Sequence, residues 1–205
     1  MPAGRDLAGV DGCRNGWVVA TATGARVVPG FAELLAERFA LALIDIPIGL
    51  LAGPRQCDRE ARRLLGPRRS SVFPAPPCGL LKARQYAGQC SIQLWNILPK
   101  IREVDEGITA RLQRRVREAH PECSFALLNG APLRFSKKTA AGEAERRLLL
   151  RPHFGEIAHL PGAARDDVLD AYALLWSARR AAAGEARVLG DGERDPRGLA
   201  CEIVG

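Results

Sequence analysis

One short stretch near the N-terminus, Leu7-Ala8-Gly9-Val10-Asp11-Gly12-Cys13, carries a single carboxylate in a run of small and apolar residues. A run of this length and composition predicts a central β-strand that presents Asp11 at its end. Ionised carboxylates are almost never buried unless they are paired or bind a metal, so Asp11 is a candidate functional residue. Later stretches offer further carboxylates that this strand could meet: Asp45, Glu118, Glu122, Asp166, Asp167 and Asp170.

The residues that follow this stretch predict a sheet that begins as a meander. Asn15-Gly16 suits the positive φ of a tight hairpin turn, so the next strand is expected to run antiparallel to the first. Another apolar run contains Asp45 and is typical of a strand covered on both faces. The predicted order is β-β-β-α-β, with strands over 7–12, 17–22, 25–29 and 41–46 and a helix over 31–39.

The rest of the chain has mainly helical patterns. Pro99 predicts a break in the third of these helices, because proline removes a backbone hydrogen bond. Asp166, at the acidic start of the last and strongest helix, is interpreted as its N-cap. The expected helices cover residues 31–39, 56–65, 80–106, 121–128, 142–150 and 165–183, with short strands over 114–120 and 199–204.

Length and composition predict an ordinary globular protein. A chain of 205 residues fits a single domain over 1–205. Residues 1–6 include an acid and lack the apolar core of a signal peptide, and no apolar run approaches the roughly 20 residues needed to cross a bilayer. We therefore expect a cytoplasmic protein with no membrane partner. The six cysteines lack zinc-binding or redox spacing and are expected to be reduced and mostly buried.

The charge balance is basic. The net charge is +7, and the sequence pI is about 9.5. A polyanionic partner such as nucleic acid is one explanation, and an arginine-rich composition without a specific partner is the other. Two basic loops could contact phosphates, or could simply be exposed. Their candidate binding residues are Arg68, Arg69, Ser70, Ser71, Lys137 and Lys138.

The carboxylates favour a site for Mg²⁺ or Mn²⁺ over a zinc site. Asp11 and Asp45 each lie in an apolar strand and would be side by side if those strands are neighbours, while Asp167 and Asp170 share one face of a helix. Like charges this close repel unless a cation is bound, and oxygen ligands suit Mg²⁺ or Mn²⁺. Two such ions roughly 4 Å apart can support phosphodiester hydrolysis. Each acid taken singly could instead be a cap, a turn residue or a solvated charge.

Two other motifs carry less weight. His120-Pro121-Glu122 matches half of a zinc-deaminase signature, but the Pro-Cys-x-x-Cys half does not follow it. The three tryptophans, Trp17, Trp95 and Trp176, lie in apolar stretches and are interpreted as core residues, so the chain shows no aromatic stripe for base stacking.

Several motifs, in order along nearly the whole chain, resemble those of the DUF429 family, which is described as predicted RNase H-like nucleases. They are Gly9-Val10-Asp11-Gly12-Cys13, Gly16-Trp17-Val18-Val19, Ile44-Asp45-Ile46-Pro47-Ile48-Gly49-Leu50, Arg68-Arg69-Ser70-Ser71-Val72-Phe73-Pro74, Leu98-Pro99-Lys100-Ile101-Arg102-Glu103-Val104-Asp105, His120-Pro121-Glu122-Cys123-Ser124-Phe125, Ser136-Lys137-Lys138-Thr139 and Asp166-Asp167-Val168-Leu169-Asp170-Ala171.

The resemblance implies an α/β, ribonuclease H-like mixed sheet, with three antiparallel strands and then parallel strands, flanked by helices. Residues 53–109 would be a mostly helical insertion after the fourth strand. The implied metal ligands are Asp11, Asp45 and Asp170. Asp167 and Glu118 complete the implied catalytic set, and Glu122 is the next candidate.

The sequence thus predicts a nuclease that hydrolyses phosphodiester bonds of DNA or RNA with two Mg²⁺ or Mn²⁺ ions. One alternative is a non-catalytic RNase H-like domain that binds nucleic acid, a nucleotide or a protein. A further alternative is phosphoryl transfer to a small molecule, although Gly9 and Gly12 do not have the spacing of a phosphate-binding loop.

Overall fold

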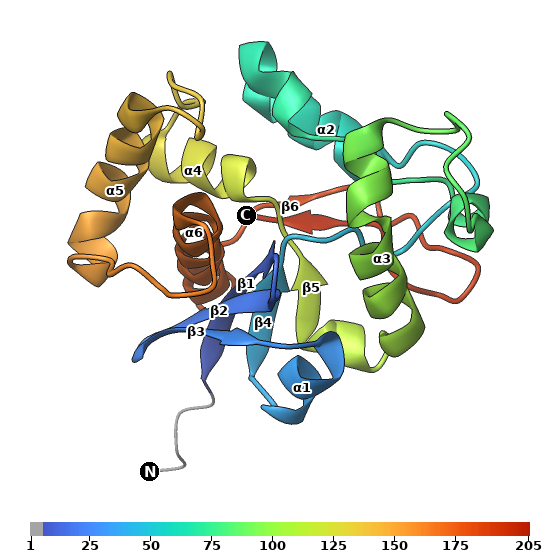
Figure 1. Ribbon diagram of the computed structural model, residues 1–205, viewed down its shortest axis with the longest axis horizontal. Helices are drawn as coiled ribbons and strands as arrows, with labels where there is room; N and C mark the ends of the chain where they lie inside the picture. Colours follow the sequence, from blue (N-terminus) through green and yellow to red (C-terminus); the bar gives the residue numbers. More distant parts are fainter. Residues whose placement is uncertain (1–5) are drawn as a thin grey trace.

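The chain folds around a five-stranded mixed sheet (Figure 1). The computed structural model describes residues 6–205, so the expectation about the apolar content of the N-terminus falls largely on residues 1–5, outside the described part. The strands are β1 (Leu7–Cys13), β2 (Gly16–Thr21), β3 (Gly24–Val28), β4 (Leu41–Ile44) and β5 (Val116–Glu118), in the spatial order β3-β2-β1-β4-β5. Strands β1, β2 and β3 pair antiparallel, whereas β4 and β5 join in parallel.

This arrangement confirms the predicted fold class. Helix α1 (Phe31–Ala36) lies between β3 and β4 in the chain, which gives the predicted order β-β-β-α-β. The mixed sheet with flanking helices is consistent with a ribonuclease H-like fold. Several predicted elements are a few residues too long: the helix expected over 31–39 ends at Ala36, and the strand expected over 41–46 ends at Ile44, three residues before Pro47.

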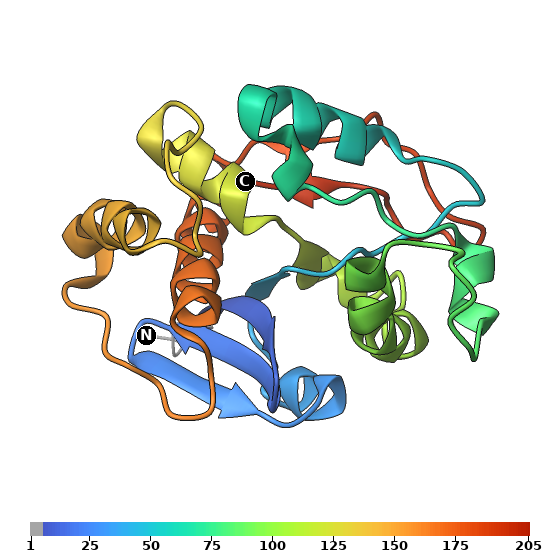
Figure 2. The ribbon, with the colours of Figure 1, turned by 45° about the horizontal axis from the view of Figure 1, so that its top comes forward.

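Helices cover both faces of the sheet. Successive side chains of a strand point to opposite faces, so alternate residues of β1 contact different helices. Ala8 and Val10 of β1 belong to one hydrophobic cluster with α1 and with α3 (Ile92–Gly107). The alternate residues, Gly9 and Asp11, therefore face the opposite layer. That layer contains the long helix α6 (Arg165–Ala182), which runs across the sheet (Figures 1 and 2).

Gly9 allows α6 to lie directly against β1. A Cβ atom at this position would collide with the backbone of Ala171 and Leu175. Only glycine therefore permits this close approach, which brings the N-terminal half of α6 to the end of β1 where Asp11 lies.

The segment between β4 and β5 contains α2 (Gln56–Leu65), two short 3₁₀ helices, η1 (Gly66–Ser71) and η2 (Cys78–Lys82), and α3. The predicted break at Pro99 is wrong, because α3 continues through this residue. Leu98, Ile101 and Val104 are buried in the core, and this packing outweighs the loss of one helical hydrogen bond. The predicted helical start at residue 80 is also wrong: α3 begins at Ile92.

Residues 112–205 supply the last strand of the main sheet, three helices and a small second sheet. They form η3 (Leu112–Arg114), β5, α4 (Pro121–Asn129), α5 (Ala140–Phe154) and α6, followed by the small strands β6 (Val188–Leu189) and β7 (Ile203–Val204), which pair with each other. Gly130 ends α4 in the left-handed conformation. The six cysteines carry free thiols, and four of them are buried. Within residues 6–205, none of the helices is long and apolar enough to cross a bilayer.

Candidate functional site

Asp11 and Asp45 lie at the same edge of the sheet, on neighbouring strands. Val10 of β1 pairs in parallel with Ile44 of β4, and each acid is the next residue in its strand direction. The backbone N–H of Asp45 donates to the carbonyl of Val10 over 2.9 Å, which fixes this alignment. The Oδ1 atom of Asp11 accepts from the N–H of Gly12 over 2.7 Å. The structure therefore brings the two strand-borne carboxylates together, as the sequence predicts.

Asp170 joins these two acids from α6. Its side chain is 1% exposed, and among residues 6–205 its buried Oδ1 atom has no hydrogen-bond partner. A buried carboxylate oxygen normally has a partner, so this atom is available to a ligand that arrives from the cavity. The third acid of the predicted metal set thus reaches the cluster through the close contact of α6 with Gly9.

The three carboxylates disfavour one another's charge. Burial raises the pKa of Asp11 well above its usual range, and the negative charges of Asp45 and Asp170 raise it further. Burial likewise raises the pKa of Asp45, although His120 and Lys137 oppose the effect. The pKa of Asp170 rises to about 6 through burial, which the charge of Lys137 only partly offsets. Such a cluster is costly in the ionised state unless a cation neutralises it.

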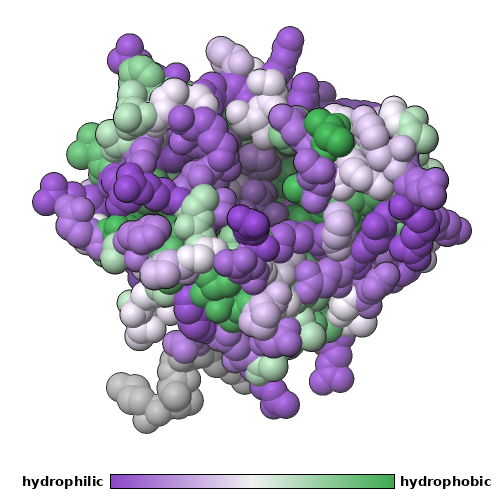
Figure 3. All heavy atoms as spheres, viewed as in Figure 1, coloured by the Kyte–Doolittle hydropathy of each residue, from purple (hydrophilic) through white to green (hydrophobic). Residues whose placement is uncertain are grey.

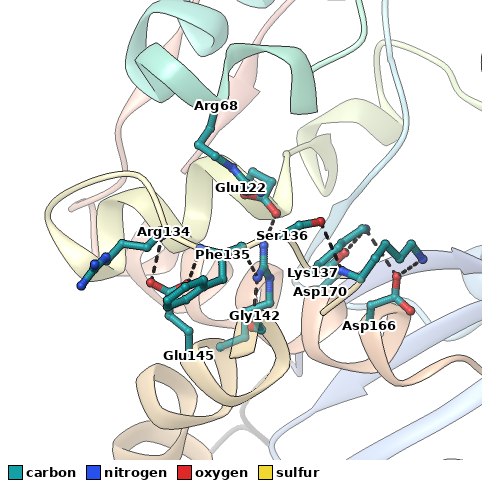
Figure 4. A network of polar contacts seen from close by, with 12 residues as sticks. Arg68, Glu122, Arg134, Phe135, Ser136, Lys137, Gly142, Glu145, Asp166 and Asp170 are labelled. Atoms are coloured by element: carbon teal, nitrogen blue, oxygen red, sulfur yellow. Dashed lines mark hydrogen bonds and ion pairs between the residues drawn. The ribbon is translucent and has the colours of Figure 1, made fainter. Parts of the chain in front are cut away.

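Lys137 supplies one positive charge to the cluster. Its Nζ atom lies 2.5 Å from Oδ2 of Asp170 and 4.0 Å from Oδ2 of Asp166. Burial alone would lower the pKa of Lys137, but the carboxylates of Asp170 and Asp11 outweigh it and raise the pKa above its ordinary value. Lys137 is therefore charged and acts as an internal counter-ion for the acids (Figure 4).

The start of α6 differs from the prediction. Ala164 is the N-cap residue, and Asp166 lies in the first turn, where it pairs with the exposed ammonium group of Lys138. Asp167 accepts a hydrogen bond from the backbone N–H of Ala164 over 3.3 Å. The interpretation of Asp166 as the N-cap is wrong, because the helix already begins at Arg165 and Asp166 is its second residue. Burial and Asp166 raise the pKa of Asp167, which faces the cluster more distantly.

Glu118 has a different environment from the other predicted acids. The Arg55 guanidinium donates to both oxygens of Glu118, each over 2.7 Å, and also to Asp58. The Ile48 N–H donates to the same carboxylate over 2.7 Å. Burial raises the pKa of Glu118 to about 7 despite Arg55, because one guanidinium serves two buried acids. With its oxygens engaged in this way, Glu118 ties β5 to the segment that precedes α2.

Glu122 is engaged in a second ion-pair network (Figure 4). One of its oxygens accepts from the fully buried Arg146 of α5, and the other lies 3.5 Å from Arg68 of η1. Arg146 also donates to the carbonyl of Phe135, which leads into the Lys137 loop. Glu122 therefore links both basic loops to the start of α4.

The three aspartates of the cluster line one cavity of about 870 Å³, together with Glu118, Glu122 and Lys137. Figure 3 shows the surface hollowed between the α4–α5 side and the α2–α3 side. Every predicted site residue except Arg69 lines this cavity; Arg69 is exposed and lies outside it. Its lining includes Asp11, Asp45, Glu118, Asp167, Asp170, Arg68, Ser70, Ser71, Lys137 and Lys138.

Sequence reasoning does not identify three residues that pair with the predicted acids or lie beside them. Arg55 and Arg146 are buried partners of Glu118 and Glu122, and they lie 63 and 24 residues away from these acids in the chain. His120 lines the cavity and is the N-cap of α4, accepting from the Glu122 N–H through Nδ1. In the sequence, Pro121 indicates that a helix begins after His120. The ion pairs of Arg55 and Arg146 have no local sequence pattern that would predict them.

The donor set suits a hard divalent cation. It consists of carboxylate oxygens from three elements, with one buried oxygen lacking a partner. Within residues 6–205, however, no three acidic, histidine or cysteine side chains already converge as a ligand group. Lys137 lies against Asp170 instead. A cation at this cluster would require the side chains to adjust and Lys137 to withdraw from Asp170.

Comparisons with known proteins agree with the motifs in the sequence. No curated protein and no solved structure matches the chain. A family model described as "Protein of unknown function (DUF429)" matches residues 9–194, which include every acid of the cluster. The chain belongs to the DUF429 family.

Proposed function

We propose that this protein is a divalent-metal-dependent nuclease that hydrolyses phosphodiester bonds in nucleic acid. The observation that carries the proposal is the meeting of Asp11, Asp45 and Asp170, from three separate elements, at the floor of a large cavity. Raised pKa values at all three acids mark a cluster assembled against electrostatic cost. Clusters of this kind are typical of functional sites.

Asp11, Asp45 and Asp170 would hold Mg²⁺ or Mn²⁺, with Oδ1 of Asp170 as the oxygen that no protein group uses. A divalent pair bound by carboxylates supplies water activation and stabilisation of the leaving oxygen. Asp167 fixes the first turn of α6 and so orients Asp170. Arg68, Ser70, Ser71 and Lys138 line the cavity and would bind the phosphate backbone.

Glu118 takes a structural role in this proposal. Its two oxygens already accept from Arg55 and from the Ile48 N–H. Recruiting Glu118 as a metal ligand would leave the Arg55 charge buried and poorly paired. The proposed machinery is therefore the three aspartates, with Asp167 and Lys137 beside them.

The alternative is a non-catalytic domain that binds nucleic acid. The Lys137–Asp170 ion pair favours it, because a permanent internal counter-ion would make a metal unnecessary. The two functions differ in one requirement: the nuclease needs a divalent ion, and the binding domain does not.

The test is cleavage of labelled DNA, RNA, hybrid and branched substrates in Mg²⁺, Mn²⁺ or chelator. We expect cleavage only with a divalent ion, and its loss in Asp11→Asn. The matched control is Asp191→Asn, an exposed acid outside the cavity, which should cleave like the wild type. If the folded wild type cleaves none of these substrates with either ion, the nuclease proposal fails.

A further inference from the structure

Two exposed hydrophobic side chains line the same cavity as the carboxylates. Phe73, which follows η1, is 48% exposed, and Ile97 of α3 is 40% exposed. Single exposed apolar residues are common on protein surfaces. An aromatic ring and an aliphatic side chain in one polar cavity form instead a surface suited to a flat apolar ligand face.

The loop that carries Phe73 is held on both sides. Val72 is 1% exposed, and its carbonyl accepts from Arg62 over 2.6 Å. The Ala75 N–H donates to Asp58 over 3.0 Å, and Asp58 is bound to Arg55. Between these anchors Pro74 restricts the backbone. The ring of Phe73 is thus presented on a rigid support, tied through Arg55 to the sheet, and little ordering is needed when a ligand binds.

The charged residues that line the cavity differ in exposure. Every acid is buried or half-buried, as are the cations Arg55, Lys100 and Lys137, whereas the cations Arg14 and Lys138 are exposed. Arg68 also lines it, with a buried Nε that lacks a partner. Gln93 and Asn96 of α3 add amide groups. An entering ligand therefore meets positive charge, an aromatic ring and hydrogen-bonding amides before it reaches the carboxylates.

We propose that Phe73 is the stacking platform for one unpaired base of the substrate, whose phosphate lies toward the carboxylate cluster. A base offers its flat face only when it is unstacked, as in a single strand or a flipped-out nucleotide. A cavity of about 870 Å³ has the size of sites for small molecules, and holds an unpaired nucleotide unit. This inference rests on the proposed function and names its substrate class: an unpaired nucleotide, in a strand or free.

The experiment measures binding in chelator, so that it does not depend on cleavage. Anisotropy would compare a fluorescent single strand with the same strand containing abasic sites and with a duplex, and nucleoside monophosphates would serve as competitors. The variants are Phe73→Ala, Phe73→Tyr and the control Leu148→Ala, an exposed apolar residue on α5 outside the cavity.

We expect Phe73→Ala to weaken binding of the single strand roughly tenfold or more, from the loss of one stacked base. Phe73→Tyr and Leu148→Ala should bind like the wild type, and the abasic strand should not distinguish Phe73→Ala from it. If nucleoside monophosphates compete, the free nucleotide is also a ligand. If they do not compete, the site binds nucleotides only within a strand.

Equal binding of wild type and Phe73→Ala would overturn the inference, as would an equal loss on the abasic strand or a wild type that binds neither strands nor nucleotides. These outcomes are separate from those of the cleavage test. If cleavage requires a metal but Phe73→Ala binds like the wild type, the nuclease proposal stands and the base site is refuted. If binding depends on Phe73 but no substrate is cleaved, the base site stands and the nuclease proposal is refuted.

Discussion

The Nζ atom of Lys137 lies 2.5 Å from Oδ2 of Asp170, so a loop side chain neutralises the most deeply buried acid of the cluster. A divalent cation bound through Oδ1 of Asp170 would neutralise the same carboxylate from its other oxygen. Lys137 and the cation therefore compete for one carboxylate, and this competition can be measured through stability.

Replacing Lys137 with methionine should destabilise the protein in chelator, because Asp170 loses its counter-charge. We expect a loss of about 1–2 kcal/mol, below the usual cost of breaking a buried pair because about a third of the Lys137 side chain is exposed. With saturating Mn²⁺ the loss should shrink, and the stabilisation by Mn²⁺ should exceed that of the wild type. Chemical denaturation with and without Mn²⁺ checks this; an unchanged Mn²⁺ response would contradict competition.

Asp11→Asn should stabilise the metal-free protein while it removes metal binding. The substitution deletes a charge whose pKa is raised by burial and by Asp45 and Asp170. We expect the free energy of unfolding in chelator to rise by about 0.5–2 kcal/mol, which is the usual gain when one stabilising substitution is made. Thermal unfolding should also show no added stabilisation by Mg²⁺ or Mn²⁺. A variant less stable than the wild type in chelator would argue against electrostatic repulsion in the cluster.

Glu118 should make stability depend on pH. Its pKa in the folded protein is about 7, above the value of 4.5 expected when unfolded, so the folded state binds the extra proton. The stabilisation from this group is complete below about pH 4.5 and is lost as pH rises to about 7. At about 1.4 kcal/mol per unit, the loss approaches about 3 kcal/mol.

The measurement is the free energy of unfolding of wild type and Glu118→Gln between these pH values, each in chelator. The difference between the two proteins should change with pH by the predicted amount. Parallel curves would show that Glu118 stays ionised throughout and that Arg55 fully compensates its burial.

Gly9→Ala should be among the most destabilising single substitutions, because its Cβ would collide with the backbone of α6. Neither backbone can move without shifting Asp11 away from Asp170, so we expect a loss of at least about 3 kcal/mol. Gly53→Ala is the control, since an added Cβ there meets no atom within 4 Å. Denaturant unfolding measures both; a mild effect at position 9 would mean that α6 can slide.

The sequence predicts those parts of the site that depend on local pattern. Apolar runs place Asp11 and Asp45 on strands, and the amphipathic pattern around Asp170 places it on a helix. Glu118 is assigned to catalysis from its strand position, but Arg55, which engages it, is 63 residues away, and no periodicity reports such a pair. Helix α3 passes Pro99 for a similar reason: its stability comes from the core that it contacts, which a local pattern does not show.

Strands β4 and β5 are neighbours in the sheet although residues 45–115 separate them in the chain. The entropy of closing such a loop grows slowly with its length, by about 0.6 kcal/mol per doubling. The Arg55–Glu118 ion pair joins the start of the segment between β4 and β5 to β5 itself. The exposed stretch at 84–89 can therefore change in length without moving the aspartates. The same stretch lies outside the cavity lining, so natural variation or engineering can alter it while the strands that carry the acids stay fixed.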